Sequence, residues 1–135
     1  MGAHVLVVED DPAVLELVTR ILQLEGYRVD AVSTSRAAMD AVQAADPDVL
    51  LLDLILPDAD GVLLHGRLRR IRPGIEKRTI FMTGFSSQTP VVDYLRSLSA
   101  VFLHKPFAAS ELVSAVGMVA RRREAAAIGA GSSRS

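Results

Sequence analysis

Short apolar runs alternate with amphipathic stretches along most of the chain. The apolar runs have the length of strands, and the stretches between them carry apolar residues at helical spacing, as Val14, Val18 and Leu22 do in the first. Repeated strand–helix units predict a parallel sheet with helices on both faces. The predicted strands are His4–Val8, Arg28–Val32, Asp48–Leu52, Thr79–Met82 and Ala100–Leu103, and the predicted helices cover residues 11–24, 34–45, 60–71, 88–98 and 109–123.

Polar residues and prolines mark where these helices are expected to begin and end. Asp11 followed by Pro12 is typical of a helix N-terminus, because the carboxylate accepts hydrogen bonds from free N–H groups and proline has no N–H to leave unpaired. Ser33 or Ser35 is expected to cap the second helix, and Asp46-Pro47 is expected to end it.

The polarity of each apolar run predicts its place in the sheet. The first, third and fourth runs are almost continuously apolar, as strands buried on both faces are. The second run alternates polar and apolar residues, and the fifth is short and ends at His104-Lys105, so both are expected at the edges. The order 2-1-3-4-5 satisfies this. It predicts an α/β three-layer sandwich of flavodoxin-like order, in which a five-stranded parallel sheet is flanked by five helices.

Composition narrows the class of protein further. The 135 residues include no Cys, which excludes disulfides, cysteine zinc sites and thiol catalysis. The net charge of −1 argues against direct nucleic-acid binding, and no apolar run approaches the length of a membrane span. We expect a cytoplasmic domain over residues 4–122, and an unstructured tail or the start of a linker over 123–135. The basic run 121–123 is expected to be a solvated helix end.

Acidic residues follow two neighbouring strands of the predicted sheet. Glu9 and Asp10 come directly after the first strand, and Asp53 comes after the third. Ligands bind at the carboxyl ends of parallel strands where the strand order reverses, which is between these two strands. Close carboxylates repel each other unless a cation joins them, and an all-oxygen set of ligands suits Mg²⁺. The sequence therefore predicts a magnesium site at this edge, where Thr83 and Lys105 also lie.

The segments that carry these residues resemble the receiver domain of two-component response regulators. They are VLVVEDDP (5–12), PDVLLLDLILPDADG (47–61), FMTG (81–84) and FLHKPF (102–107), and the resemblance covers about residues 4–122. It implies a phosphorylation-controlled signalling module whose phosphoryl group comes from a histidine kinase or a histidine phosphotransfer protein. Such a module is not an enzyme, beyond assisting its own phosphorylation and dephosphorylation. The resemblance also implies a downstream protein partner and a homodimer through the fourth helix, fifth strand and fifth helix.

The resemblance assigns a role to each matched residue. Asp53 matches the phosphoacceptor, Thr83 the switch hydroxyl, Lys105 the lysine that pairs with the phosphoryl group, and Phe102 the switch aromatic. The implied Mg²⁺ ligands are Glu9, Asp10, Asp53 and the backbone carbonyl of Ile55, whereas Asp11 is expected only to cap a helix. Because a carboxylate nucleophile forms an acyl phosphate directly, the rest of the site has to supply positioning and charge neutralisation.

Three positions depart from the family pattern. Gly84 follows the switch threonine, where Ala is more usual. Leu98-Ser99-Ala100 replaces the usual Gly-Ala pair, which predicts a short or irregular fourth helix. His104 stands directly before Lys105, where an apolar or small residue is more usual. We expect it to be an exposed edge residue rather than a phosphate carrier.

Two further positions bear on how long a phosphoryl group would persist. They lie two residues after the acceptor and two residues after the switch threonine, and here they are Ile55 and Phe85. Bulky apolar side chains obstruct an attacking water and orient it poorly. We therefore expect a long-lived phosphorylated state.

Other functions remain open at this point. An Asp-nucleophile phosphohydrolase usually carries a second Asp two residues after the first, where this chain has Ile55. A flavin-binding electron carrier would need a first loop that attracts phosphate, and the acidic run 9–11 would repel one. A receiver-like interaction domain that is not phosphorylated, and a receiver excised from a hybrid sensor kinase, are the alternatives that keep the same fold.

Overall fold

Five parallel strands form one sheet in the order β2-β1-β3-β4-β5 in the computed structural model, as the sequence predicted. The structure describes residues 2–84, 90–97 and 100–132. The elements in chain order are β1 (His4–Val8), α1 (Pro12–Leu24), β2 (Arg28–Val32), α2 (Ser35–Ala44), β3 (Val49–Asp53), α3 (Gly61–Ile71), the 3₁₀ helix η1 (Ile75–Arg78), β4 (Thr79–Thr83), α4 (Pro90–Ser97), β5 (Val101–His104) and α5 (Ala109–Ser132).

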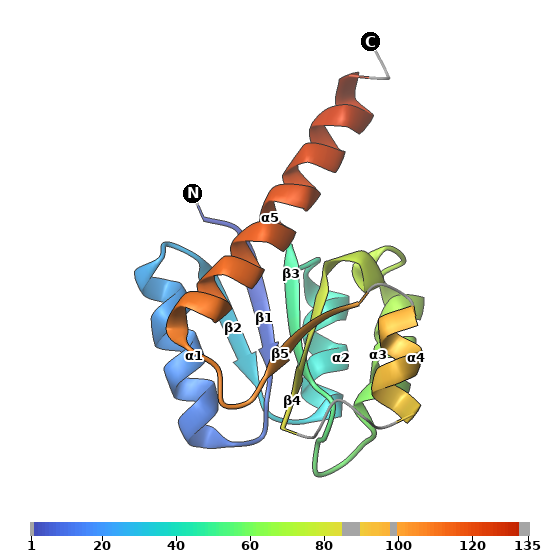
Figure 1. Ribbon diagram of the computed structural model, residues 1–135. Coiled ribbons are helices and arrows are strands. Elements are labelled where there is room, and N and C mark those ends of the chain that lie inside the picture. The colour runs from blue at the N-terminus through green and yellow to red at the C-terminus, as the bar shows by residue number, and fades with distance from the viewer. Residues whose placement is uncertain (1, 85–89, 98–99, 133–135) are drawn as a thin grey trace.

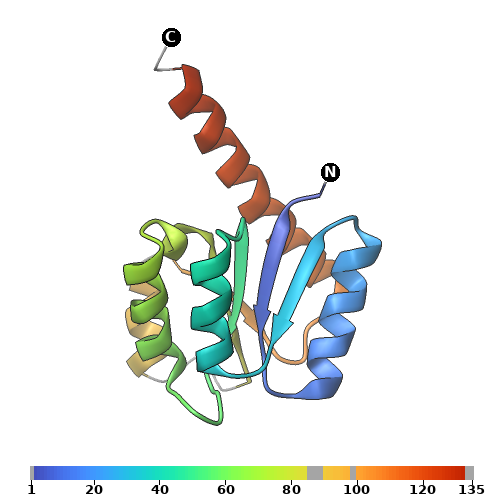
Figure 2. The ribbon, with the colours of Figure 1, turned by 180° about the vertical axis from the view of Figure 1, so that it is seen from behind.

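The helices divide between the two faces of the sheet. Helices α1 and α5 cover one face, which is turned to the viewer in Figure 1, and α2, α3 and α4 cover the other, whose α2 and α3 are in front in Figure 2. Each face has its own apolar core. One contains Val18 and Leu22 of α1 with Leu112, Val116 and Val119 of α5, and the other contains Val42 of α2 with Leu64 and Leu68 of α3. This is the predicted three-layer sandwich.

Burial along the strands agrees with their predicted places. All residues of β3 and β4 are buried, and four of the five in β1 are, whereas β2 at one edge is largely exposed. Strands β3 and β5 each lie one residue later than the sequence predicted. The shift places Asp53 at the last position of β3 rather than just beyond it. None of the described helices is long and apolar enough to cross a membrane.

The N-terminal cap of α2 differs from the two predicted candidates. Thr34 is the cap, and its side chain accepts a hydrogen bond from the backbone N–H of Ala37 at 3.1 Å. Ser35 is the first helical residue instead. Its backbone N–H and hydroxyl both donate to the carboxylate of Asp58, the hydroxyl at 2.7 Å. The serine therefore ties the start of α2 to the β3–α3 loop, and these bonds lower the pKa of Asp58.

Helix α5 is longer than predicted, which corrects the expected unstructured segment from 123 onward. It continues to Ser132 and projects beyond the sheet (Figure 1). Residues 124–127 are Glu-Ala-Ala-Ala, and alanine is the strongest helix former, so the run extends the helix before the first glycine of the tail is reached.

The basic run at residues 121–123 is also not simply a solvated helix end. Arg123 is half-buried and pairs with Asp48 and Asp46, each at 2.9 Å. Asp46 also pairs with the buried Arg78, whose Nε donates to the carbonyl of Pro47 at 3.2 Å. This network ties α5 to the α2–β3 loop at the amino end of β3.

The environment of His65 on α3 leads us to expect that the stability of the fold depends on pH. Its ring lies edge-on to Phe81 at 4.9 Å, and its Nε2 is 3.2 Å from the Thr79 hydroxyl. Burial and, secondarily, the charge of Arg69 hold the pKa of His65 below its usual value of 6.5. The fold therefore favours the neutral ring, so its stabilising contribution is complete above about pH 6.5 and is lost as the pH falls through the lower pKa of the folded state.

We expect the His65→Gln variant to lose less stability than the parent chain between pH 7 and pH 5. Urea unfolding at several pH values measures this. The control is His104→Gln, which removes an exposed imidazole instead of the partly buried one. Parallel pH curves for the parent chain and His65→Gln would contradict the prediction.

Candidate functional site

The carboxyl ends of four neighbouring strands bring together the residues that the sequence singled out. β1 and β3 pair from Val5↔Val49 to Val8↔Leu52, so Glu9 and Asp10 lie beside Asp53. On the other side, β4 ends at Thr83, which pairs with His104 of β5, the residue before Lys105. Parallel strands that start in register also end in register, so the four chain segments meet at one edge of the sheet.

Glu9 is a fully buried carboxylate at the end of β1. It accepts hydrogen bonds from the ammonium of Lys105 and from the backbone N–H of Asp11. Its own backbone N–H donates to the carbonyl of Val32 at 3.0 Å, which fixes the start of the loop. Burial and the neighbouring Asp53 carboxylate raise the pKa of Glu9 to about 7, although the bond from Lys105 opposes the shift.

Asp53 is 6% exposed, and both of its carboxylate oxygens are engaged. Oδ2 accepts a hydrogen bond from Nζ of Lys105 at 3.0 Å, and Oδ1 accepts one from the backbone N–H of Ile55 at 2.9 Å. The next residue is anchored as well, because the N–H of Leu54 donates to the carbonyl of Met82 at 3.1 Å. The carboxylate is therefore held in one orientation at the carboxyl end of β3.

Lys105 joins the two buried carboxylates. Burial alone would lower the pKa of its ammonium, but the hydrogen bonds to Glu9 and Asp53 outweigh burial and the pKa is raised. The backbone N–H of Lys105 donates to the carbonyl of Thr83 at 2.8 Å, which sets the position from which the side chain reaches across β4. The lysine is thus a fixed positive charge between two negative ones.

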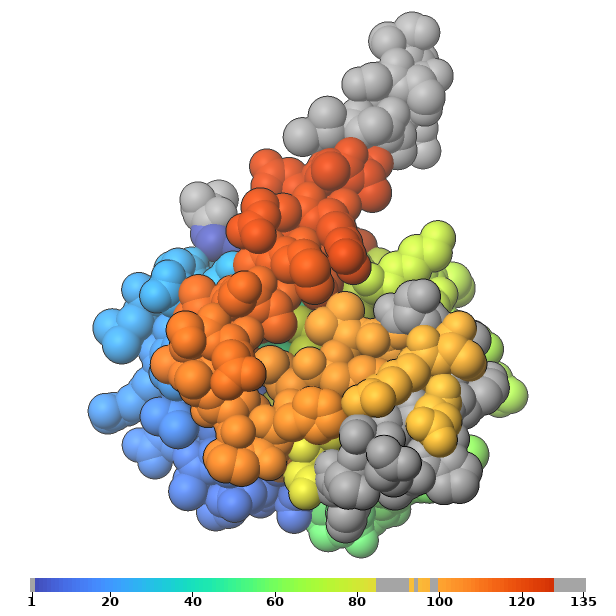
Figure 3. Space-filling model, in the orientation of Figure 1, coloured from blue at the N-terminus to red at the C-terminus, as the bar shows by residue number. Residues whose placement is uncertain are grey.

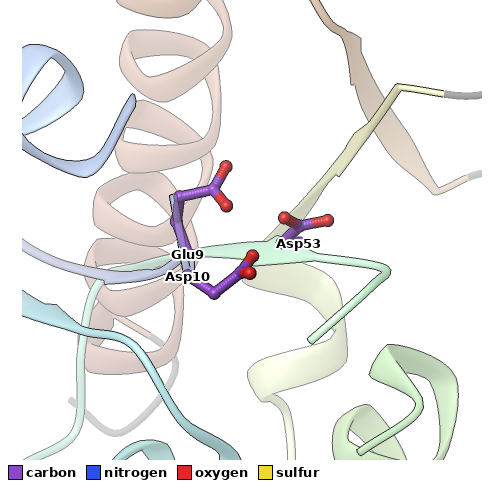
Figure 4. Close-up of side chains that lie close together, drawn as sticks. All are labelled: Glu9, Asp10 and Asp53. Carbon is purple, nitrogen blue, oxygen red and sulfur yellow. The ribbon is translucent and has the colours of Figure 1, made fainter. Parts of the chain in front are cut away.

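Three carboxylates converge at this edge, and together they suit a hard divalent cation. Glu9, Asp10 and Asp53 each offer an oxygen, and these three oxygens lie within 4.8 Å of one another. Figure 4 shows them at the ends of β1 and β3, with Asp10 directed toward Asp53. Lys105 neutralises only part of their charge, and Asp10 is exposed, which leaves room for water ligands. An all-oxygen set with open positions fits Mg²⁺.

The loop after Asp53 is held tightly closed. Ile55 pairs with Asp60 across an isolated bridge, and the N–H of Gly61 donates to the carbonyl of Leu54 at 3.0 Å. A side chain on Gly61 would lie 2.6 Å from Cα of Leu54 and 2.7 Å from the carbonyl oxygen of Asp53. The close approach of α3 to the end of β3 therefore requires glycine at this position.

Thr83 and Phe102 lie on neighbouring strands beside the carboxylates. Thr83 is buried at the end of β4. Phe102 is half-buried on β5, with its ring centroid 5.8 Å from that of Phe81 and 6.5 Å from that of His104. The guanidinium of Arg96 from α4 lies 5.8 Å above the Phe102 ring, which is a cation–π contact between the helix and the strand.

The structure therefore brings the predicted site residues together, and Asp11 caps α1 as expected, accepting from the N–H groups of Ala13 and Val14. His104 is exposed, as expected. Phe85 and Leu98-Ser99 lie outside the described residues. Sequence reasoning missed Gly61, Arg96 and the bond from Ser35 to Asp58. Only the first had a sequence signal, a glycine directly after a capping aspartate.

Comparisons with known proteins agree with this geometry. The family model described as response regulator receiver domain matches residues 5–117. The chain is 36% identical over 121 residues to the transcriptional regulatory protein TcrA of Mycobacterium tuberculosis, an alignment that covers 90% of this chain and 47% of that protein. The chain thus spans about half the length of the curated relatives it matches.

Two solved structures illustrate the likeness of fold. The signal receiver domain of a signal transduction histidine kinase from Syntrophus aciditrophicus has a TM-score of 0.74 and 30% identity, covering 89% of this chain and 91% of that one. A CheY-like receiver domain protein from Methanospirillum hungatei has a TM-score of 0.81 at 24% identity, covering 92% of this chain and 98% of that one.

Proposed function

The chain belongs to the response regulator receiver domain family, and from that premise we propose that Asp53 accepts a phosphoryl group and so controls a protein-interaction surface. Receiver domains of response regulators are signalling modules. The observation that carries the proposal is the setting of Asp53, a buried carboxylate bound by Lys105 and by the Ile55 N–H beside two further carboxylates.

In the proposed step, a carboxylate oxygen of Asp53 attacks the phosphorus of a phosphohistidine on a histidine kinase or a phosphotransfer protein. The phosphorus–nitrogen bond breaks, and the ring nitrogen leaves with the electron pair and takes up a proton from water. An aspartyl phosphate results. The Ile55 N–H keeps Oδ1 of Asp53 in place, and Lys105 is close enough to transfer its hydrogen bond from the carboxylate to a phosphoryl oxygen.

Mg²⁺ is the cation that we propose for the cluster. Glu9, Asp10 and Asp53 would hold it together with the backbone carbonyl of Ile55, and when bound it supplies neutralisation of the charge on the phosphoryl oxygens. These ligands suit Mg²⁺ because all of them are oxygen atoms. Their carboxylates also carry more negative charge than Lys105 neutralises.

The proposed response to phosphorylation runs through Thr83 and Phe102. The Thr83 hydroxyl would turn toward a phosphoryl oxygen, and Phe102 would move into the space that it leaves. The contact of Arg96 with the Phe102 ring supports a response that reaches α4. The surface that changes would be the one formed by α4, β5 and α5, where a downstream protein or a second copy of the chain would bind.

The wider setting is proposed on the same premise. Residues 4–122 would act as the receiver unit in the cytoplasm, with no direct nucleic-acid contact and no catalysis beyond the unit's own phosphorylation and dephosphorylation. Mg²⁺ dependence and a histidine kinase partner follow from the same assignment.

Treatment with a small phosphodonor and Mg²⁺, read by intact mass, tests the central proposal. We expect the parent chain to gain one phosphoryl group and Asp53→Ala to gain none. Asp40→Ala is the matched control, since Asp40 is an exposed carboxylate on α2 that pairs with Arg36 of the same helix, and it should be phosphorylated like the parent. A parent chain that gains nothing at any Mg²⁺ concentration would instead favour an unphosphorylated receiver-like domain.

The lifetime of the phosphoryl group gives a separate prediction. Ile55 is 50% exposed and lies next to the acceptor carboxylate, to which its N–H is bound. Replacing it by asparagine offers a polar group that can orient a water, so Ile55→Asn is expected to shorten the half-life of the phosphorylated state by roughly tenfold. Phosphate loss over time measures this for Ile55→Asn and Phe85→Glu, with Ile55→Val as the apolar control. Unchanged half-lives in both polar variants would refute the prediction.

A further inference from the structure

The end of the sheet opposite Asp53 carries an open groove, which we call the amino-end groove. One wall is the last part of α3 with η1, the other is the projecting half of α5, and the floor includes Thr79 and Val101 at the amino ends of β4 and β5. Figure 3 shows the hollow between the red part of α5 and the yellow-green end of α3 and η1. The groove is separate from the carboxylate cluster, because strands run from one to the other.

Both walls of the groove are basic. Arg69 and Lys77 line one wall, and Arg121 and Arg122 line the other. All four are exposed, and none forms an ion pair within the described part of the chain. In total six Lys and Arg residues line the groove against three Asp and Glu residues, a local charge of +3 in a chain whose net charge is −1.

The nearby carboxylates do not neutralise these four cations. Asp48 is engaged by Arg123, and Asp46 by both Arg123 and Arg78. Glu76 accepts a hydrogen bond from the backbone N–H of Gly74 at 2.7 Å, and Glu124, the third acidic residue of the lining, is exposed and forms no ion pair within the described part of the chain. With all three carboxylates counted, the lining keeps a local charge of +3, and this positive charge is available to a ligand from outside.

A glycine on α5 lets the guanidinium of Arg121 lie along the helix. Gly117 stands one turn before Arg121, and a side chain there would lie 3.1 Å from Nη1 of Arg121. The absence of a side chain leaves room for the guanidinium to lie against the helix. The groove has a volume of about 1650 Å³, which exceeds the range of roughly 300–1,000 Å³ for small-molecule sites. Its size and open shape fit an extended chain segment better than a small molecule.

We propose that the amino-end groove binds an acidic peptide segment of a partner protein, with apolar side chains among its carboxylates. The four free cations would pair with the carboxylates, since guanidinium groups bind carboxylates in bidentate fashion. The apolar residues would contact Val101 on the floor and Ala120 on α5, which are both half-buried. A nucleic-acid duplex fits less well, because its continuous phosphates call for a more extensive basic surface than four cations beside an apolar floor.

Fluorescence anisotropy with a labelled synthetic peptide of Asp, Glu and Leu residues tests the proposal on the full chain. We expect saturable binding at low salt that weakens as NaCl is added. The double variant Arg69→Ala/Arg121→Ala should bind about tenfold more weakly. The control is Arg20→Ala/Arg36→Ala, which removes two arginines that are 75% and 81% exposed on α1 and α2 and should bind like the parent.

Three results would overturn the proposal: no saturable binding of the peptide, an equal loss of binding in the control double variant, or tighter binding of labelled duplex DNA or of anionic lipid vesicles than of the peptide. Urea unfolding of both double variants should match the parent, because the replaced side chains are exposed. Phosphorylation of Asp53 in Arg69→Ala/Arg121→Ala should also be unchanged. A failure of the peptide-binding proposal can therefore be distinguished from a failure of the proposal that Asp53 is phosphorylated.

Discussion

Replacing Gly61 by alanine is expected to destabilise the fold by about 3 kcal/mol and to slow phosphorylation of Asp53. The added Cβ would lie 2.6 Å from Cα of Leu54 and 2.7 Å from the carbonyl oxygens of Asp53 and Leu54. These are backbone atoms, which cannot rotate away as the end of a side chain can. The start of α3 and the end of β3 would have to separate, and the hydrogen bond from Gly61 to Leu54 would be strained or lost.

The same separation would disturb Asp53, the proposed phosphoacceptor. The N–H of Ile55, which binds Oδ1 of Asp53, belongs to the loop that Gly61 closes. Gly66→Ala is the matched control on the same helix, because nothing lies within 4 Å of a Cβ built there. It should be neutral or stabilising by up to about 1 kcal/mol through helix propensity. Urea unfolding measures the stability of both variants, and phosphodonor labelling measures their phosphorylation. Equal stability of Gly61→Ala and Gly66→Ala would contradict the predicted clash at Gly61.

The strand order and the gathering of the acids could both be predicted because each depends on short stretches of sequence. Continuous apolar runs identify central strands whatever the tertiary detail, and the alternating run of β2 identifies an edge. Once the order is known, parallel pairing places Glu9 and Asp53 side by side. The acid cluster was therefore a consequence of topology and did not need any side-chain geometry.

Features that depend on contacts between distant segments could not be predicted in the same way. Ser33, Thr34 and Ser35 all carry the hydroxyl of a helix cap, and Ser35 is excluded from that role by its bonds to Asp58, a residue 23 positions away. Arg123 reads as a solvated charge in a basic run, and its pairing with Asp46 and Asp48 follows from where α5 crosses the strand ends. Likewise, Gly61 follows a capping aspartate and Gly66 does not, but that signal does not indicate that Gly61 is packed against backbone atoms and Gly66 is not.

The chemistry of the site shows the same division. The residue types at the strand ends predicted a cation among carboxylates, but not which carboxylate would be buried deepest. Glu9 is fully buried and Asp10 is exposed, because β1 ends at Val8 and the chain turns outward toward the cap at Asp11. Glu9 therefore depends on Lys105 for its charge balance far more than Asp10 does.

Replacing Lys105 by methionine is expected to lower the free energy of unfolding by about 3 kcal/mol when no divalent cation is present. Methionine keeps most of the length of the side chain but removes the ammonium that binds both Glu9 and Asp53. Removing one partner of a buried ion pair leaves the other charge uncompensated, which lowers the stability of the fold by roughly 3–5 kcal/mol. We take the lower end of that range because Lys105 is 23% exposed and because Glu9, whose pKa is already raised to about 7, can take up a proton when the ammonium is removed.

Mg²⁺ should restore a larger part of the stability of Lys105→Met than it adds to the parent chain, because the variant has three carboxylates and no resident cation among them. Urea unfolding with MgCl₂, against NaCl at the same ionic strength, separates binding at the cluster from general screening. Arg20→Met is the control, since Arg20 is an exposed arginine 3.8 Å from Glu16 and should change stability by less than about 0.5 kcal/mol with or without Mg²⁺. If Lys105→Met were as stable as the parent without Mg²⁺, the lysine would not be what allows Glu9 and Asp53 to lie buried side by side.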